Sequence, residues 1–255
     1  MKMAKIILSA QNFDIYQGDN LDPFARTGDT SPEQLKSAGA QGVIIGHSEV
    51  GDSPKIIHQK LLTLANKKLL PKTTVLLGES WQEFDGQTPD QVASTISSMT
   101  TAILKDIPSA FIKQLVLGYE PKWGSRGSGR DDMSPPTPEF ISACVKAIKS
   151  QAKTTPVIYG GRSTPERTKT ILADDNVAGL ILGSACNTIE KTLAIAQAMK
   201  KVKGNKPKIL HANFKAYHLT ESYEDYLKAI NQLDNSFTIY LSPPHTDIYK
   251  LKQLL

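Results

Sequence analysis

Short runs of consecutive apolar residues recur along the chain, and most are followed by a longer stretch with the spacing of an amphipathic helix. The runs are continuous rather than alternating, which is the pattern of β-strands that are covered on both faces. Alternation of such strands with helices is typical of parallel sheets with helical crossovers. We therefore predict eight strands, at residues 5–9, 42–45, 74–77, 114–117, 157–159, 179–182, 208–212 and 237–241.

Four of the predicted helices begin with the same signal, a hydroxyl side chain followed by proline and an acidic residue. The hydroxyl residues are Ser31, Thr88, Thr137 and Thr164. A hydroxyl oxygen can accept a hydrogen bond from a main-chain N–H group of the first turn, and proline fits that turn because it has no N–H group to satisfy. Repeated use of this start predicts repeated right-handed crossovers between parallel strands.

Eight parallel strands in 255 residues match the requirement of a (β/α)8 barrel, so the predicted fold class is α/β. The structural alternative, an open doubly wound sheet, usually has a glycine-rich fingerprint after its first strand. Gln11 and Asn12 stand there instead. The best candidate for a linker, residues 203–207, is only long enough to join a helix to the next strand. We therefore expect a single domain over residues 1–255.

Composition and charge exclude several classes of protein. The two cysteines, Cys144 and Cys186, supply neither a disulfide framework nor a zinc motif. No apolar stretch is long enough to span a bilayer, and the N-terminus lacks the plan of a signal peptide, so we expect a cytoplasmic protein with no membrane partner. The net charge of +5 suits anionic ligands, but scattered lysines without interleaved aromatic residues argue against a nucleic-acid partner.

Candidate chemistry stands at the carboxyl ends of the predicted strands, where barrels of this kind carry their active sites. His47, Glu120 and Lys215 follow three of these strands. A carboxylate can take a carbon-bound proton, a neutral imidazole can polarise a carbonyl group, and an ammonium group can stabilise an oxyanion. Singly, each residue has an ordinary explanation, as a buried histidine, a strand-end ion pair or a surface lysine. Their shared position favours a functional site.

Three glycine-containing segments also follow predicted strands, and they can present main-chain N–H groups to an anion such as phosphate. They are residues 127–129, 160–161 and 183–184. Ordinary turns use the same residues, so this signal is weaker. No set of His, Cys, Asp or Glu residues with the spacing of metal ligands accompanies them, and we expect neither a metal nor a cofactor.

Taken together, these motifs resemble those of the triosephosphate isomerase family. The segment VIIGHSE resembles the histidine motif of the family, GYEPKW its motif for the base and lid, YGG its phosphate motif, ANFK its Asn-Trp-Lys motif and LSPP its Ala-Pro-Pro motif. The resemblance covers essentially the whole chain. It implies a (β/α)8 TIM barrel and an isomerase of glycolysis and gluconeogenesis. Such an enzyme interconverts dihydroxyacetone phosphate and D-glyceraldehyde 3-phosphate by proton transfer through an enediolate.

The motifs stand in an unusual order. In the family the Asn-Trp-Lys motif opens the chain, whereas Asn213 and Lys215 lie near the C-terminus here. This chain begins with what resembles the third strand of the family, followed by Gln11 and Asn12. The resemblance therefore implies a circular permutation, which a closed barrel tolerates when old and new termini lie together at one surface.

The resemblance assigns a role to each matching residue. Glu120 would move the proton between the two carbons, and His47 would polarise the carbonyl group. Lys215 and Asn213 would bind the substrate and stabilise the enediolate. Glu49 would support the geometry of the lysine and the histidine.

For the phosphate group, the resemblance implies main-chain contacts from Gly127 in the lid, and from Gly183 and Ser184. The family has a serine where this chain has Arg162, and Ser163 comes one position later. We expect Arg162 to supply a charged phosphate contact in place of the serine hydroxyl, with Ser163 as the alternative.

Residues 12–28 form a longer loop than is usual in the family, and it ends in Thr27 and Gly28, which resemble the interlocking dimer loop of the family. In that loop a threonine inserts beside the active-site lysine of a second subunit. The resemblance therefore implies a homodimer in which Thr27 supports the site, although Arg26 replaces the flanking aromatic residue.

Two other functions stay open from the sequence. Another phosphate-binding barrel enzyme would share the glycine segments, but not the combination of Asn213, Lys215, His47 and Glu120. A catalytically weak or silent phosphate-binding scaffold would keep the fold, and the altered lid and Arg162 leave that alternative open.

Overall fold

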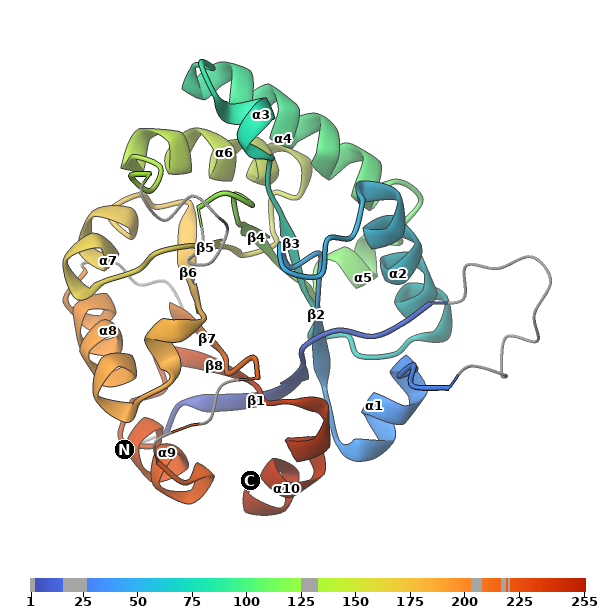
Figure 1. Ribbon diagram of the computed structural model, residues 1–255, viewed down its shortest axis with the longest axis vertical. Coiled ribbons are helices and arrows are strands. Elements are labelled where there is room, and N and C mark those ends of the chain that lie inside the picture. Colours follow the sequence, from blue (N-terminus) through green and yellow to red (C-terminus); the bar gives the residue numbers. More distant parts are fainter. Residues whose placement is uncertain (1–2, 16–26, 125–132, 203–207, 217–218, 220) are drawn as a thin grey trace.

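The computed structural model describes residues 3–15, 27–124, 133–202, 208–216, 219 and 221–255. Eight parallel strands follow one another around a closed barrel, which the pairing of the last strand with the first completes (Figure 1). The strands are β1 (Lys5–Ala10), β2 (Gly42–Ile45), β3 (Thr74–Leu77), β4 (Val116–Tyr119), β5 (Val157–Gly160), β6 (Val177–Leu182), β7 (Lys208–Asn213) and β8 (Phe237–Ser242). The predicted fold class is therefore confirmed.

Helices surround the barrel and connect successive strands (Figure 1). They are α1 (Pro32–Ala38), α2 (Pro54–Lys67), α3 (Trp81–Phe84), α4 (Pro89–Leu104), α5 (Ser109–Ile112), α6 (Pro138–Gln151), α7 (Pro165–Ile171), α8 (Ile189–Lys201), α9 (Tyr223–Ile230) and α10 (Ile248–Leu254), with the 3₁₀ helices η1 (Ser184–Cys186) and η2 (His245–Asp247). Within the described part of the chain, none of these helices has the length and apolar character needed to cross a membrane. The expected linker at residues 203–207 lies outside the described residues.

Seven of the predicted strands lie within observed ones, and the fourth prediction begins too early because β4 starts at Val116. The main-chain N–H of Gln114 donates to the carbonyl of Phe111 at 2.9 Å, and that of Leu115 donates to Ile112 at 3.1 Å. Both residues therefore close the turn after α5 rather than joining the sheet. In the sequence these residues look like the start of a strand, because Leu115 is apolar and buried although it lies in a turn.

The predicted helix starts are confirmed in position. The hydroxyl oxygens of Ser31, Thr88 and Thr164 each accept a hydrogen bond from a main-chain N–H group in the first turn of α1, α4 and α7. Thr137 stands at the start of α6 with an extended backbone, but its side chain makes no capping hydrogen bond. Proline at the first position and the packing of the apolar face suffice to begin that helix.

The barrel has two apolar layers, because successive residues of a strand point to opposite faces of the sheet. One layer fills the interior of the barrel with side chains from the strands: Ile7, Ile44, Leu76, Val116, Ile158, Ile181, Ile209 and Tyr240. The other lies between the strands and the surrounding helices and contains most of the buried apolar residues. The strands are thus held from both sides, which gives the loops at their carboxyl ends a rigid base.

Candidate active site

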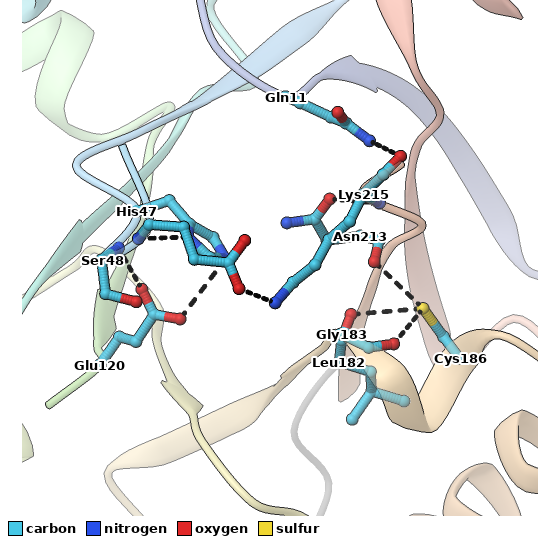
Figure 2. A network of polar contacts seen from close by, with 10 residues as sticks. Gln11, His47, Ser48, Glu120, Leu182, Gly183, Cys186, Asn213 and Lys215 are labelled. Atoms are coloured by element: carbon cyan, nitrogen blue, oxygen red, sulfur yellow. Dashed lines mark hydrogen bonds and ion pairs between the residues drawn. The ribbon is translucent and has the colours of Figure 1, made fainter. Parts of the chain in front are cut away.

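The structure brings the predicted catalytic side chains together at the carboxyl end of the barrel. His47 follows β2, Glu120 follows β4, Asn213 ends β7, and Lys215 comes two residues later. Figure 2 shows the side chains of His47, Glu120 and Lys215 directed toward a common region. Together with the loops after β5 and β6, these residues line a cavity of about 440 Å³.

Glu120 and His47 form the buried centre of this site, and each is only 6% exposed. Glu120 Oε2 accepts a hydrogen bond of 3.0 Å from the main-chain N–H of Ser48. Glu120 Oε1 lies 3.6 Å from His47 Nε2 (Figure 2). The carboxylate is therefore fixed by one main-chain donor and faces the imidazole with its other oxygen.

The main chain also determines which nitrogen of His47 carries the proton. The N–H group of Glu49 donates to His47 Nδ1 at 3.1 Å. A main-chain nitrogen can only donate, so Nδ1 must be the acceptor and the proton of the neutral ring lies on Nε2. This nitrogen is the one that faces Glu120, so the loop after β2 aims a neutral N–H donor at the cavity.

Lys215 is held in a backbone conformation that non-glycine residues rarely adopt, with φ at 51°. Its carbonyl oxygen accepts a hydrogen bond of 2.8 Å from Gln11 Nε2 (Figure 2), and its N–H group donates to Asn213 Oδ1 at 3.1 Å. Its ammonium group forms an ion pair with the carboxylate of Glu49. These contacts offset the backbone strain and direct the ammonium group toward His47 and Glu120.

Gln11 is a supporting residue to which the sequence analysis assigned no role. Besides the carbonyl of Lys215, its Nε2 donates to the carbonyl of Ser242 at 3.1 Å. It therefore ties the loop after β7 to the end of β8. The only signal in the sequence is a polar side chain directly after a predicted strand.

The segment after β6 carries Gly183 and Ser184, both of which line the cavity as expected. Cys186 lies in η1 behind them, and its thiol contacts the carbonyls of Leu182 at 3.3 Å, Gly183 at 3.0 Å and Asn213 at 3.4 Å (Figure 2). Burial raises the pKa of this thiol to about 12, so it stays protonated and donates. Cys186 thereby joins the loop after β6 to the end of β7.

Gly183 leaves room for the side chain of Lys215, which passes close to it. A Cβ atom at Gly183 would lie 2.9 Å from Lys215 Cε and 3.2 Å from Nζ. Any larger residue would displace the ammonium group, so the predicted phosphate loop and the predicted catalytic lysine depend on each other.

Arg162 is placed differently from the simple phosphate contact that the sequence predicts. Its Nε donates to the carbonyl of Gly124 at 3.3 Å, and Nη2 donates to that of Met133 at 2.5 Å. Arg162 and Ser163 both line the cavity. The hydroxyl of Ser163 donates to the carbonyl of Gly161 at 3.4 Å. The expected lid contact Gly127 lies outside the described residues.

A buried carboxyl group supports the strand that carries Glu120. Glu79 Oε1 accepts hydrogen bonds of 3.0 Å from Tyr119 Oη and from Trp123 Nε1. Burial raises the pKa of Glu79, in spite of these donors. Because Tyr119 precedes Glu120 and Trp123 follows it, the bonds fix the chain on both sides of the Glu120 carboxylate.

Of the supporting residues expected from the sequence, Glu49 lies beside the site. The side chain of Glu49 is half exposed and pairs with Lys215, while its main chain binds His47. Thr27 is exposed on this single chain. Among the residues that the structure describes, no group of three or more His, Cys, Asp or Glu side chains is arranged to hold a metal ion.

Comparison with known proteins places this chain in a family. A family model described as triosephosphate isomerase matches residues 1–199. The triosephosphate isomerase of Mycoplasmoides gallisepticum is 31% identical over 184 residues, which are 68% of this chain and 70% of the relative. That of Lawsonia intracellularis is 32% identical over 207 residues, 78% of this chain and 77% of the relative. The triosephosphate isomerase of Lacticaseibacillus casei is 33% identical over 184 residues, which are 69% of this chain and 71% of the relative. The chain belongs to the triosephosphate isomerase family.

Proposed function

We propose that this chain interconverts dihydroxyacetone phosphate and D-glyceraldehyde 3-phosphate, with Glu120 as the base that moves a proton between adjacent carbons. The observation that carries the proposal is the buried pair of Glu120 and His47, whose Oε1 and Nε2 atoms lie 3.6 Å apart at the cavity wall. A base beside an N–H donor suits removal of a proton next to a carbonyl group. Family membership supports the same reaction, and with it a role in glycolysis and gluconeogenesis in the cytoplasm.

In the first step Glu120 takes the proton from the carbon next to the carbonyl group. The electron pair of the broken C–H bond forms a carbon–carbon double bond, and negative charge moves onto the carbonyl oxygen. His47 donates its Nε2–H to that oxygen, because Nδ1 is occupied by the N–H group of Glu49. A fixed donor stabilises the charge without reorganising during the reaction.

In the second step the proton returns from Glu120 to the neighbouring carbon, while His47 moves a proton between the two oxygens. Lys215 supplies positive charge beside the enediolate, and the amide of Asn213 orients the substrate from the same side of the cavity. Base and acid are regenerated, so the isomerisation balances without a cofactor or metal.

The phosphate group of the substrate binds at the wall formed by the loops after β5 and β6. This wall contains Gly183, Ser184, Arg162 and Ser163. The segment after β6 places small residues against the cavity, which lets a phosphate approach main-chain N–H groups closely. A phosphate held there would keep the reacting carbons near Glu120.

The Glu120→Gln variant tests the role of the base. Glutamine has the same shape but cannot accept a carbon-bound proton, so we expect kcat to fall by roughly 10²–10⁴-fold or more. The measurement is a coupled assay of isomerisation in both directions, with circular dichroism to verify the fold. The control is Glu224→Gln, an exposed site on α9, which should match the wild type. Equally low residual rates in wild type and Glu120→Gln would instead support the silent phosphate-binding scaffold.

For Arg162 we propose a charged contact with the phosphate, in addition to its bonds with Gly124 and Met133. The guanidinium group has five N–H donors, so contacts to two carbonyls and to an anion are compatible. In the Arg162→Ser variant we expect KM and the inhibition constant of inorganic phosphate to rise together, roughly tenfold, which is about 1.4 kcal/mol. Steady-state kinetics with phosphate as competitor measures both.

The matched control for this variant is Arg167→Ser. Arg167 donates to the carbonyls of Arg162 and Pro136 but does not line the cavity. The Arg167→Ser variant should therefore leave inhibition by phosphate unchanged. An Arg162→Ser variant whose KM rises while inhibition by phosphate stays the same would contradict direct contact, and would assign Arg162 to holding Gly124 and Met133.

We also propose that the chain is circularly permuted, so that β7 and β8 correspond to the first and second strands of the family and β1 to the third. The family model ends at residue 199, yet β7 and β8 come after it and complete the barrel. The relatives quoted above match over 70–77% of their own lengths, which leaves about two strand–helix units of each unmatched. A linear comparison loses such a segment when it stands at the opposite end of the chain.

Rearranging the gene tests the permutation. Placing residues 205–255 before residue 1, through a flexible linker, restores the strand order expected for the family. We expect the rearranged chain to fold with the same circular dichroism spectrum and to keep kcat/KM within a few-fold, because every βα loop stays intact. Loss of cooperative unfolding in the rearranged chain, with the original chain folded, would contradict the proposal.

A homodimer through the loop at residues 12–28 is the last part of the proposal. Residues 16–26 lie outside the described residues, while Thr27 is exposed and Gly28 has a φ of 89°, as at the end of a tight turn. Sedimentation should give about twice the 27.9 kDa of one chain. Thr27→Arg should shift the mass toward one chain, because a bulky charge cannot enter a packed interface. A single-chain mass for the wild type would contradict the dimer.

A further inference from the structure

A polar bridge crosses the interior of the barrel below the active site. His211 lies in the middle of β7 and is completely buried. Its Nδ1 lies 3.2 Å from the hydroxyl of Thr74 at the start of β3, and its Nε2 lies 2.8 Å from the hydroxyl of Ser242 at the end of β8. Thr74 and Ser242 are also completely buried. One imidazole ring therefore connects β3, β7 and β8 inside the mainly apolar layer that fills the barrel.

The ring at this position is neutral, and both of its nitrogens are satisfied. Burial lowers the pKa of His211 to about 3. A neutral imidazole has one donor and one acceptor, and hydroxyl groups can complement either. The ring also stacks on Tyr240, with centroids 5.1 Å apart and planes at 29°. A bridge with every polar atom paired is rigid, because moving one member leaves another unpaired in an apolar surrounding.

Ser242 links this bridge to the catalytic lysine. Its carbonyl oxygen accepts a hydrogen bond of 3.1 Å from Gln11 Nε2 and another of 3.0 Å from the N–H group of Phe214. Gln11 Nε2 also donates to the carbonyl of Lys215 at 2.8 Å. The position of Ser242 therefore influences the positions of Phe214, which precedes the lysine, and of the carbonyl group of Lys215.

The same bridge lies directly below the substrate-binding amide. Asn213 is two residues after His211 on the interior face of β7, and it is paired in register with Ser242. Its Oδ1 accepts from the N–H group of Lys215. The positions of Asn213 and Lys215 are therefore set by the β7–β8 pair that His211 connects, whereas Glu120 and His47 are set by the main chain of Ser48 and Glu49.

We infer that His211 is a positioning residue for the isomerase reaction. By bridging Thr74 and Ser242 it fixes the end of β8, and with it the strained main chain of Lys215 and the amide of Asn213. The inference rests on the proposed function, because it concerns binding by Lys215 and Asn213. The competing interpretation is that His211 only fills space in the core.

The His211→Phe variant separates positioning from packing when it is measured on the full chain. Phenylalanine fills the space but bonds neither hydroxyl. We expect KM to rise roughly tenfold, which corresponds to about 1.4 kcal/mol, and kcat to change less than threefold. This split follows because Lys215 and Asn213 hold the substrate and the enediolate alike, so their displacement weakens the binding of both by a similar factor. Glu120 and His47 keep their own main-chain donors.

A compensated variant removes the effect of unpaired hydroxyl groups. His211→Phe combined with Thr74→Val and Ser242→Ala makes this part of the interior fully apolar. If His211 only fills space, both the unfolding midpoint in urea and KM return to the wild-type values, and the inference is overturned. If His211 positions the site, the midpoint recovers and KM stays raised.

Two single substitutions complete the test. Ile209→Val shortens an apolar side chain on the same face of the same strand, so it should lower the unfolding midpoint and leave KM unchanged. Ser242→Ala keeps His211 and removes only its hydroxyl partner, so it covers the case in which His211→Phe fails to fold. We expect KM to rise in Ser242→Ala by a smaller factor, and an unchanged KM in this folded variant would overturn the inference.

The proposed function and this inference fail in different ways. A wild-type chain without isomerase activity, or one that Glu120→Gln leaves unaffected, contradicts the proposed function. An active wild type whose KM is insensitive to the substitutions at His211 and Ser242 contradicts only the positioning role of His211.

Discussion

Closure of the parallel sheet is the constraint on which the rest of the structure depends. β8 pairs with β1 from Lys5 and Thr238 to Leu8 and Leu241, so the sheet has no free edge. In a closed parallel barrel all carboxyl ends of the strands lie on one rim, whichever strand the chain begins with. Residues far apart in the sequence, such as His47 and Lys215, therefore meet at one cavity. The order of the strands in the chain matters for folding more than for the geometry of the site.

At this rim, main-chain N–H groups orient the side chains of Glu120 and His47. The single loop after β2 provides the N–H group that fixes Glu120 and the N–H group that selects the tautomer of His47. That loop begins at Gly46, with a φ of 77°, where a Cβ atom would lie 2.2 Å from the carbonyl oxygen of Leu76. Glycine is thus required by both the backbone conformation and the close approach to β3. Glu120 and His47 share one rigid support, which keeps their relative position constant.

Much of the fold and the centre of the site could be predicted because their signals are local. Apolar runs mark the strands, and polar residues directly after them mark the rim. The strand prediction was wrong at Gln114, because the apolar residues of a buried turn give the same pattern in the sequence as those of a buried strand. The roles of Gln11 and Cys186 could not be read from the sequence, because their partners come from other strands. Arg162 was expected at the phosphate, and its contacts with Gly124 and Met133 depend on a loop from a different βα unit.

The strained conformation of Lys215 shows how such distant contacts produce a local geometry. A left-handed backbone at a non-glycine residue is unfavourable by itself, so it persists only where the surroundings determine it from several sides. Gln11 reaches it from β1, Asn213 from β7 and Glu49 from the loop after β2. Gly183 leaves room for its side chain. The contacts of Gln11 and Glu49 come from the ends of other strands, so the closed barrel, together with the local contact from Asn213, stabilises the conformation that aims the ammonium group into the cavity.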